Sequence, residues 1–296
     1  MAIFKDLLVV VDDSAACAGR LDLAVRLAVR FGAHVIGLYV YETPVIAGYA
    51  RTDVPAGLRV GNSIVPSYLV SRAEALEALR QAQQEMAGRA RELFRKQAEV
   101  AGITTEWRAR EGDVGRIAML HARYADLVIV GQADPDAAGS ESLREIPQQL
   151  LLGVGRPILA VPYTGTFRTI GERVLVAWNA SREATRAVND ALPLLQTATQ
   201  VTVLAINPRD GVSGEGEVPG ADLALHLSRH GVKAEASWLH ADDVTVAALL
   251  LSRLADLQAD LLVMGGYGHS RMREIVLGGV TREILQAMTV PTLLSH

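Results

Sequence analysis

The chain has 296 residues, half of them hydrophobic and 21% charged, which predicts a packed globular interior and excludes a disordered chain. The formal net charge of −4 argues against a dedicated nucleic-acid surface, which is normally basic. No apolar run approaches the roughly 18 residues of a membrane span, and the first residues lack the apolar core of a secretory signal. We therefore expect a cytoplasmic protein with no membrane partner, and its single cysteine, Cys17, fits a reducing compartment.

Five short apolar stretches alternate with helical patterns in the first half of the chain. They predict strands at 6–11, 34–40, 104–108, 126–131 and 157–161. The polar turn 12–14 opens an amphipathic helix, because apolar residues recur after it at helical spacing. Continuous strands rich in Val, Leu and Ile are typical of a parallel sheet that helices cover on both faces.

The second half repeats the first, element by element. Its predicted strands lie at 173–177, 200–206, 236–240, 260–265 and 291–294. We therefore predict an α/β fold with two tandem doubly wound, Rossmann-like domains, each with a five-stranded parallel sheet flanked by helices. Pro162 and Gly165 interrupt the periodic pattern between the copies, so we expect the domains to span residues 1–164 and 165–296.

Two differences separate the halves. The first half carries an extra segment, 42–100, which begins rich in proline and glycine and reads as one long polar helix from Ser67. The halves also differ after the fourth strand. There the first half continues from Gly131 to Pro135 without the glycine spacing of the second, and a proline lacks the N–H that a phosphate could use.

The segment 261–281 is the most informative stretch of the chain. A buried strand runs into one group of glycines, and a second group precedes a helical pattern that starts at Val280. The two groups are Gly265, Gly266 and Gly268, then Gly278 and Gly279. Glycines allow close approach of the main chain, and a helix start presents free N–H groups to an anion. The pattern predicts a phosphate cradle, to which His269 and Arg271 could add charge-assisted bonds.

With the repeat and this spacing, nearly the whole chain resembles the universal stress protein family in its tandem-domain form. Nucleotide-binding members of that family carry Gly-x-x-Gly, nine further residues, and Gly followed by Ser or Thr. Gly265, Gly268 and Gly278 match this pattern, whereas Gly279 stands where Ser or Thr is expected. The resemblance implies ATP or another adenine nucleotide as ligand, with or without Mg²⁺.

The resemblance also implies which residues hold each part of the nucleotide in the second half. Adenine would lie near the end of the second strand, at Ile206. Ribose would lie near the turn formed by Ala177, Trp178 and Asn179. Asn179 replaces the family's Asp and can still hydrogen-bond a hydroxyl. Phosphates would contact the glycine groups and Val280, with Thr281 as a hydroxyl partner that offsets the hydroxyl missing at Gly279.

In the first half, the resemblance places Asp12 or Asp13 at the ribose position and Val40 at the adenine position. Because the phosphate loop is missing there, we expect a structural domain or a different ligand. The resemblance further implies that the halves pack as an internal pseudo-dimer through their last strands, with Val161 and Leu294 near the seam. A homodimer of the whole chain stays open.

Catalytic patterns are missing from the sequence: it has no Walker lysine, no nucleophile elbow and no HExxH. We therefore expect a binding or signalling module in stress adaptation, with slow ATP hydrolysis at most. Two other readings stay open: an interaction protein in which the glycine loop is a relic, and a small-molecule enzyme on a related fold. Trp178 also suits a core position, and the pair His226 and His230 suits a surface helix. In the matching third strands, we expect Trp107 and Trp238 to be counterparts.

Overall fold

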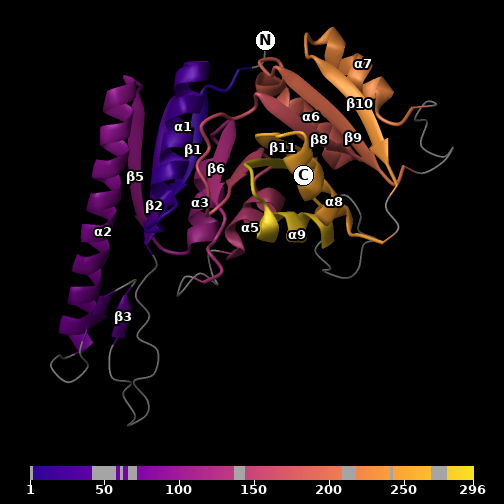
Figure 1. The fold of residues 1–296 in the computed structure, drawn as a ribbon. Coiled ribbons are helices and arrows are strands. Elements are labelled where there is room, and N and C mark those ends of the chain that lie inside the picture. Colours follow the sequence, from indigo (N-terminus) through magenta and orange to yellow (C-terminus); the bar gives the residue numbers. More distant parts are fainter. Residues whose placement is uncertain are drawn as a thin grey trace.

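The computed structural model describes residues 3–41, 58–60, 63–65, 72–136, 144–208, 218–240, 243–267 and 279–296. Ten strands in these ranges form one sheet, in the order β10-β9-β8-β11-β12-β7-β6-β1-β2-β5 (Figure 1). The strands of the first half are β1 (Asp6–Val11), β2 (His34–Tyr41), β5 (Thr105–Glu111), β6 (Leu127–Gly131) and β7 (Ile158–Val161). Those of the second half are β8 (Arg173–Trp178), β9 (Gln200–Ile206), β10 (Ala234–Leu239), β11 (Leu261–Gly265) and β12 (Thr292–Ser295).

Within each half all neighbouring strands are parallel, which confirms the predicted pair of five-stranded α/β sheets. The two sheets join through β12 and β7, which pair antiparallel with Leu294 opposite Ile158. The last strands of the two halves therefore meet, as the resemblance implied. Leu294 of β12 lies directly in this seam. Val161 is the last residue of β7, and it pairs with Gly131 of β6, on the side of β7 away from the seam.

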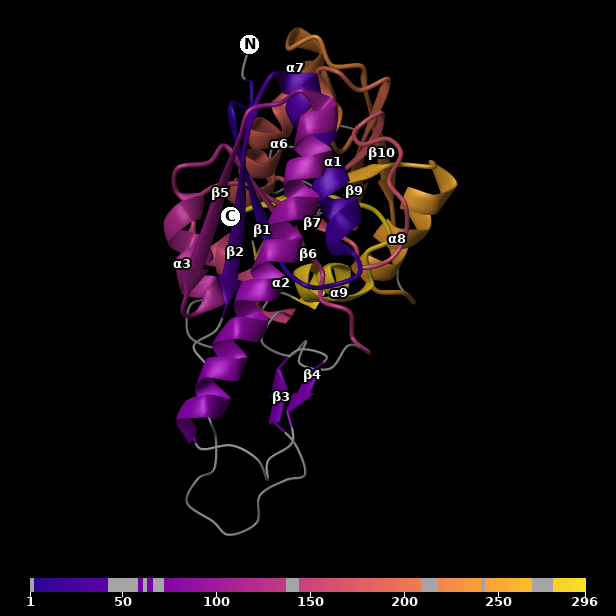
Figure 2. The same cartoon turned by 90° about the vertical axis from the view of Figure 1, so that its left-hand side faces the viewer.

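Helices cover both faces of the sheet (Figures 1 and 2). One face carries α1 (Cys17–Phe31), α2 (Arg72–Ala101), α6 (Arg182–Leu195) and α7 (Ala221–Arg229). The opposite face carries α3 (Val114–Ala122), α5 (Ile146–Gly153), α8 (Val246–Asp256) and α9 (Gly279–Ala287). None of the described helices is long and apolar enough to cross a membrane.

The strands are apolar along their whole length because both of their faces are buried. In β1, Leu7 and Val9 pack on the α1 side of the sheet, while Leu8 and Val10 pack on the α3 side. Burial of one Leu or Val side chain contributes roughly 1.5–3 kcal/mol. Strands of this composition are therefore stable only between two layers of helices.

The segment inserted in the first half contains the long helix α2 and a short antiparallel pair, β3 (Leu58–Val60) and β4 (Ser63–Val65). The polar helix predicted from Ser67 is described from Arg72 onward, and 67–71 lie outside the described residues. Helix α2 lies over β2 and β5 and continues past the sheet toward β3 (Figure 2). Gly37 makes this packing possible, because a Cβ there would lie 3.1 Å from the ring of Phe94.

The strand register corrects one expected match between the halves. Trp107 pairs with Gly37, whose counterpart in the second half is Val203, and Val203 pairs with Ala236. Trp238 therefore lies two residues further along its strand than Trp107. Trp238 is 49% exposed, whereas Trp107 is half-buried against Phe94 of α2.

Candidate functional site

The chain order of the second half reverses between β8 and β11. Strands β9 and β10 lie on one side of β8, and β11 and β12 lie on the other. In α/β sheets, ligands bind outside the carboxyl ends of the strands at such a reversal. Ala177 pairs with Met264, so the turn after β8 adjoins the end of β11. We call the carboxyl ends of β8 and β11, with the first turn of α9, the switch edge.

Three groups of residues predicted from the sequence meet at the switch edge. They are Ala177, Trp178 and Asn179 after β8, Gly265 and Gly266 after β11, and Gly279, Val280 and Thr281 in α9. Ile206 ends β9, the next strand in the sheet. The remaining predicted residues, Gly268, His269, Arg271 and Gly278, lie outside the described residues.

Asn179 shapes the turn that follows β8. Its side-chain oxygen accepts a hydrogen bond from the Ser181 N–H at 3.2 Å, and Ser181 caps α6 by accepting from the Ala184 N–H at 3.1 Å. Asp12 makes the same turn in the first half, where it accepts from the Ser14 N–H at 3.0 Å. The replacement of Asp by Asn therefore preserves the local structure, and the exposed amide NH₂ group of Asn179 is the part available to a ligand.

Trp178 and Ala177 point to opposite faces of the sheet. The half-buried indole of Trp178 packs against the apolar cluster on the α6 side, and Ala177 packs on the α8 side. This packing supports the core reading of Trp178 over a stacking role. Ile206 is half-buried on the same side as Ala177, at the point where β9 ends beside β10.

Close packing explains both glycines at the end of β11. A Cβ at Gly265 would lie 2.5 Å from the Glu183 carbonyl carbon, in the first turn of α6. A Cβ at Gly266 would collide with the side chain of Leu151 in α5 of the first half. The Gly266 N–H already donates to the Ser295 carbonyl oxygen at 2.8 Å. Packing alone therefore favours glycine at both positions, most strongly at Gly265, where the neighbouring atoms belong to the main chain.

Tyr267 and Thr281 fasten α9 to the end of β11. The Tyr267 N–H donates to the Thr281 hydroxyl oxygen at 3.2 Å, and Thr281 is only 4% exposed. The Tyr267 hydroxyl is buried and has no hydrogen-bond partner among the described residues. Burial raises the pKa of Tyr267 to about 12, although the charge of Arg282 opposes this shift. Sequence reasoning missed Tyr267, since no motif marks the residue after a glycine pair.

Gly279 is exposed in the first described turn of α9. Among the described residues, a Cβ built on it would meet one atom within 4 Å, the Glu283 Oε1 at 3.9 Å. The first N–H groups of a helix have no partner within the helix and carry its positive dipole end, which suits an anion. The Glu283 carboxylate accepts a hydrogen bond from the Thr245 hydroxyl at 2.9 Å, and its negative charge opposes an anion at this position. Val280 is half-buried against the apolar cluster below.

Residues 171–296 match the model of the universal stress protein family. This half of the chain belongs to the universal stress protein family. The chain is also 27% identical over 178 residues to the universal stress protein Slr1230 of Synechocystis, a match that spans 57% of the length of each protein.

Two solved structures share the architecture of the entire chain. A universal stress protein from Archaeoglobus fulgidus aligns with a TM-score of 0.67 at 15% identity, over 98% of this chain and 97% of its own. A functionally unknown protein from Pseudomonas aeruginosa PAO1 aligns with a TM-score of 0.55 at 14% identity, over 99% and 92%. These likenesses establish the fold. The two-domain architecture therefore extends over both halves of the chain.

The first half of the chain fills the corresponding edge with one of its own side chains. Strand registers make Gly131 the counterpart of Gly265. The guanidinium of Arg20 lies where a Cβ on Gly131 would be. Arg20 is 1% exposed, donates from Nε to the Val10 carbonyl oxygen at 3.1 Å and pairs with Asp12 at 2.6 Å.

The two acidic residues that the resemblance assigned to ribose in the first half are engaged internally. Burial raises the pKa of Asp12, but the charge of Arg20 and hydrogen bonds from Ser14 and Arg20 outweigh burial, so the net shift is downward. Asp13 accepts a hydrogen bond from the Tyr39 hydroxyl at 2.7 Å. Burial, together with the charge of Asp12, raises the pKa of Asp13 despite this bond. Val40 at the end of β2 is half-buried in the apolar cluster on the α3 side.

The two paired histidines of the second half, one in α7 and one at its C-cap, are both exposed. The rings of His226 and His230 are 4.7 Å apart. Across the described ranges, no group of three or more His, Cys, Asp or Glu residues is placed to hold a metal ion. The arrangement fits the surface reading of this pair.

Proposed function

We propose that the second half binds an adenine nucleotide such as ATP at the switch edge, with its phosphates on the main-chain N–H groups of α9. One observation carries this proposal. In the first half the buried guanidinium of Arg20 lies over Gly131, the counterpart of Gly265, whereas in the second half a turn of α6 packs there and, among the described residues, Gly279 at the start of α9 is exposed. In this proposal, the second half alone keeps an anion-binding site.

The glycine spacing supports the same conclusion. The positions of Gly265, Gly268 and Gly278 resemble the pattern of nucleotide-binding universal stress proteins. In this proposal His269 and Arg271 add positive charge around the phosphates, Asn179 contacts ribose and the main chain at Ile206 contacts adenine. The packing at Gly265 and Gly266 favours those two glycines even without a nucleotide, so the exposed start of α9 is the stronger support.

We infer a binding and signalling role rather than efficient catalysis. Of the described groups at the switch edge, Asn179 is neutral and the raised pKa of about 12 keeps Tyr267 protonated at neutral pH. Neither is suited to act as a general base. Any hydrolysis of bound ATP would therefore be slow, and ordering of the main chain by the nucleotide would be the signal.

A second candidate function is an interaction module in which the nucleotide site is a relic. Two contacts favour it. The Thr281 hydroxyl, a candidate phosphate partner, already accepts from Tyr267, and the Glu283 carboxylate lies near the start of α9. Under this reading the switch edge binds no nucleotide, and a protein partner recognises the helical surface.

A pair of variants at Gly279 separates the two functions. Gly279→Ala keeps the main-chain N–H, and among the described residues its methyl group meets only the Glu283 Oε1, at 3.9 Å. Gly279→Pro removes that N–H in the first described turn of α9, where a helix tolerates proline. Binding of Mg-ATP at about 5 mM raises the melting temperature of a protein whose native state binds it. We expect the rise in the wild type and in Gly279→Ala, and a smaller rise in Gly279→Pro.

The same experiment decides against the nucleotide if the wild type shows no rise with Mg-ATP. GTP and tripolyphosphate, used in parallel, test whether adenine or phosphate provides the recognition. An equal rise with all three would leave a phosphate site without preference for adenine. An equal rise in both variants would place the phosphates away from the first N–H of α9.

We further propose that residues 1–164 and 165–296 are the two domains and that the protein works in the cytoplasm. The connection between β7 and β8 contains the suggested boundary. Limited proteolysis of the folded protein tests this assignment. Cleavage confined to 162–172 would support it, while resistance of that connection together with cutting inside either sheet would count against it.

A further inference from the structure

Registers and helix caps reveal a second position at which the two halves differ. Arg108 of β5 pairs with Leu38, and Ser237 of β10 pairs with Leu204, the counterpart of Leu38. By the same register Glu106 in the first half corresponds to Glu235 in the second. A third pair of corresponding residues lies on the helices α3 and α8, and we identify it by counting residues from the N-cap of each helix.

Helices α3 and α8 begin with equivalent caps. The Asp113 side chain accepts from the Arg116 N–H, and the Thr245 side chain accepts from the Ala248 N–H. Counted from these caps, His121 in α3 occupies the position of Arg253 in α8. The residues that face each other between edge strand and helix are therefore Glu106, Arg108 and His121 in the first half, and Glu235, Ser237 and Arg253 in the second.

In the first half, the side chain of Arg108 fills the space between strand and helix. Its guanidinium donates two hydrogen bonds to the Glu106 carboxylate, at 2.7 and 2.8 Å. Its Nη1 lies 3.0 Å from Nδ1 of His121. Such a bidentate, charge-assisted pair is among the strongest polar contacts in proteins. The space between β5 and α3 is thus filled by a guanidinium that lies between a carboxylate and an imidazole.

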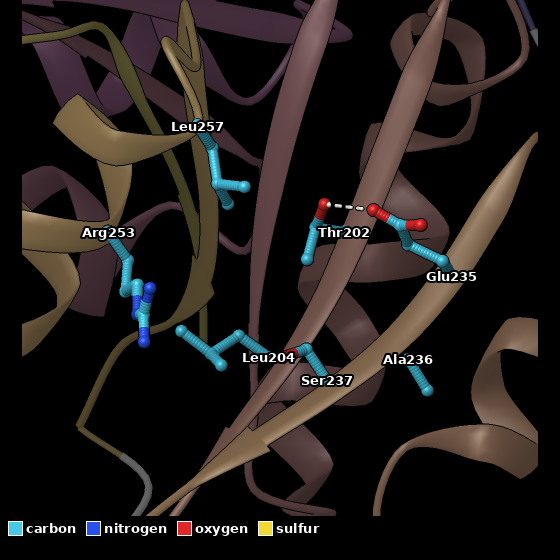
Figure 3. A pocket seen from close by; sticks show the side chains of 7 residues that line it. All are labelled: Thr202, Leu204, Glu235, Ala236, Ser237, Arg253 and Leu257. Carbon is cyan, nitrogen blue, oxygen red and sulfur yellow. Dashed lines mark hydrogen bonds between the residues drawn. The ribbon is translucent and has the colours of Figure 1, made fainter.

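In the second half, the short side chain of Ser237 leaves a cavity of about 300 Å³ at this position. Its lining residues are Thr202, Leu204, Glu235, Ala236, Ser237, Arg253 and Leu257 (Figure 3). Figure 3 shows the strand residues on one side, and Arg253 of α8 with Leu257, the residue after α8, on the other. A cavity of this size is at the lower end of the range for small-molecule sites.

The two walls of the cavity carry opposite charges that do not neutralise each other. Glu235 Oε1 accepts hydrogen bonds from Gln200 at 2.8 Å and from Thr202 at 3.2 Å, which orient the carboxylate. Arg253 pairs with Asp256 at 3.3 Å, and no ion pair between Arg253 and Glu235 occurs in the described part of the chain. A carboxylate held by two donors and a guanidinium on the facing helix therefore border the same empty space.

We propose that this cavity binds a small zwitterion whose cationic nitrogen group pairs with Glu235 and whose carboxylate pairs with Arg253. The first half supports a cationic group beside Glu235, because the guanidinium of Arg108 occupies the corresponding space there and pairs with Glu106, the counterpart of Glu235. Leu204 and Leu257 offer an apolar surface to a short methylene chain. Basic amino acids have this chemistry, and L-arginine carries the guanidinium that the second half lacks.

Titration of the full-length protein with L-arginine, followed by calorimetry and by amide NMR shifts, tests the proposal. A ligand of this size in a half-open cavity is expected to bind with a Kd of about 1 mM. Agmatine has the guanidinium without the carboxylate and should bind at least about fivefold more weakly, since it cannot pair with Arg253.

Three variants test whether L-arginine binds in this cavity. Ser237→Arg installs the side chain that fills the corresponding space in the first half and should abolish binding, and Glu235→Gln keeps the shape but should weaken binding about tenfold. Ser228→Arg adds the same charge on the exposed side of α7 and should leave binding unchanged.

Absence of L-arginine binding at about 20 mM, well above the expected Kd, would overturn the proposal, as would equal binding by Ser237→Arg. Equal affinity for agmatine would refute the pairing with Arg253. This test is independent of the nucleotide, because the cavity lies between β9, β10 and α8 rather than at the switch edge.

Discussion

Arg20 and Asp12 form an ion pair, with 2.6 Å between Nη2 and Oδ2, that seals the first-half counterpart of the switch edge. The guanidinium is 1% exposed and lies against Gly131, so the pair occupies the position where the fold would otherwise admit a ligand. At this edge of the sheet, the first half has a buried charge pair that the second half lacks. This difference is why we place the proposed nucleotide site in the second half.

Replacement of Asp12 by Asn should destabilise the protein, because it leaves the Arg20 charge buried without its partner. We expect a loss of about 3 kcal/mol in the free energy of unfolding, at the low end for a buried pair because the Asp12 side chain is 24% exposed. Urea denaturation measures this loss. Asn179→Asp at the equivalent turn is the control and should change stability by less than about 0.5 kcal/mol; a similar loss in both variants would contradict the role of the ion pair.

The same pair should make the protein sensitive to acid. The pKa of Asp12 is lower in the folded protein than its ordinary value of 3.8, so the unfolded chain takes up this proton first as the pH falls. The stabilisation is complete above that ordinary value and is lost below it, as the pH passes through the folded pKa. Asp13 acts in the opposite sense, because its folded pKa is raised.

Unfolding measured between pH 7 and about pH 3 checks this linkage. The difference in stability between wild type and Asp12→Asn should shrink as the pH falls below 3.8. A difference that stays constant over this range would show that the Asp12 charge does not contribute.

Gly265→Ala should destabilise the protein more than Gly266→Ala. The added methyl group at Gly265 meets the main chain of α6, which cannot move without shifting the helix, whereas at Gly266 it meets the end of the Leu151 side chain. We expect about 1–3 kcal/mol for Gly265→Ala, the usual range for overpacking, and less for Gly266→Ala. Urea denaturation without nucleotide gives the comparison, and the reverse order would show that side-chain packing at Leu151 is the tighter constraint.

Glu283→Gln should increase affinity for the proposed nucleotide. The change removes a negative charge from the exposed start of α9 while it preserves the shape of the side chain and a hydrogen bond to Thr245. The gain should be about twofold to fivefold, as expected for one charge near a helix end, and should shrink in high salt. Glu172→Gln on the exposed surface before β8 is the matched control. A decrease in affinity with Mg-ATP would instead indicate that Glu283 helps to hold the cation.

Tyr267→Phe should raise the free energy of unfolding by up to about 1 kcal/mol without nucleotide. The substitution removes a buried hydroxyl for which the described residues offer no hydrogen-bond partner. Thermal unfolding in the absence and presence of Mg-ATP makes this measurable. Destabilisation of the free protein would mean that the hydroxyl has a partner, and weaker nucleotide binding by the variant would identify the ligand as that partner.

The fold was predictable because its signals are local. Alternating strands and helices, repeated at matching spacing, specify two parallel sheets, since strands apolar on both faces require helices on both sides. That the last strands of the halves meet was implied by the resemblance rather than by any pattern in 157–161 or 291–294, and the structure adds that β12 and β7 pair antiparallel. The expected match of Trp107 with Trp238 was wrong by two residues. Matching residues of the same type in two sequences does not determine how their strands are paired.

By itself, the sequence determined the duplicated α/β architecture and directed attention to the second half, because glycine spacing and hydrophobic period are properties of neighbouring residues. Only the tertiary structure decided what those residues do. It brought Arg20 onto Gly131, Leu151 against Gly266, and Tyr267 to Thr281, contacts between positions far apart in the chain. Long-range packing of this kind leaves no periodic trace in the sequence. For the same reason, the cavity opened by Ser237 in place of Arg108 became apparent only when the strand registers aligned the two halves.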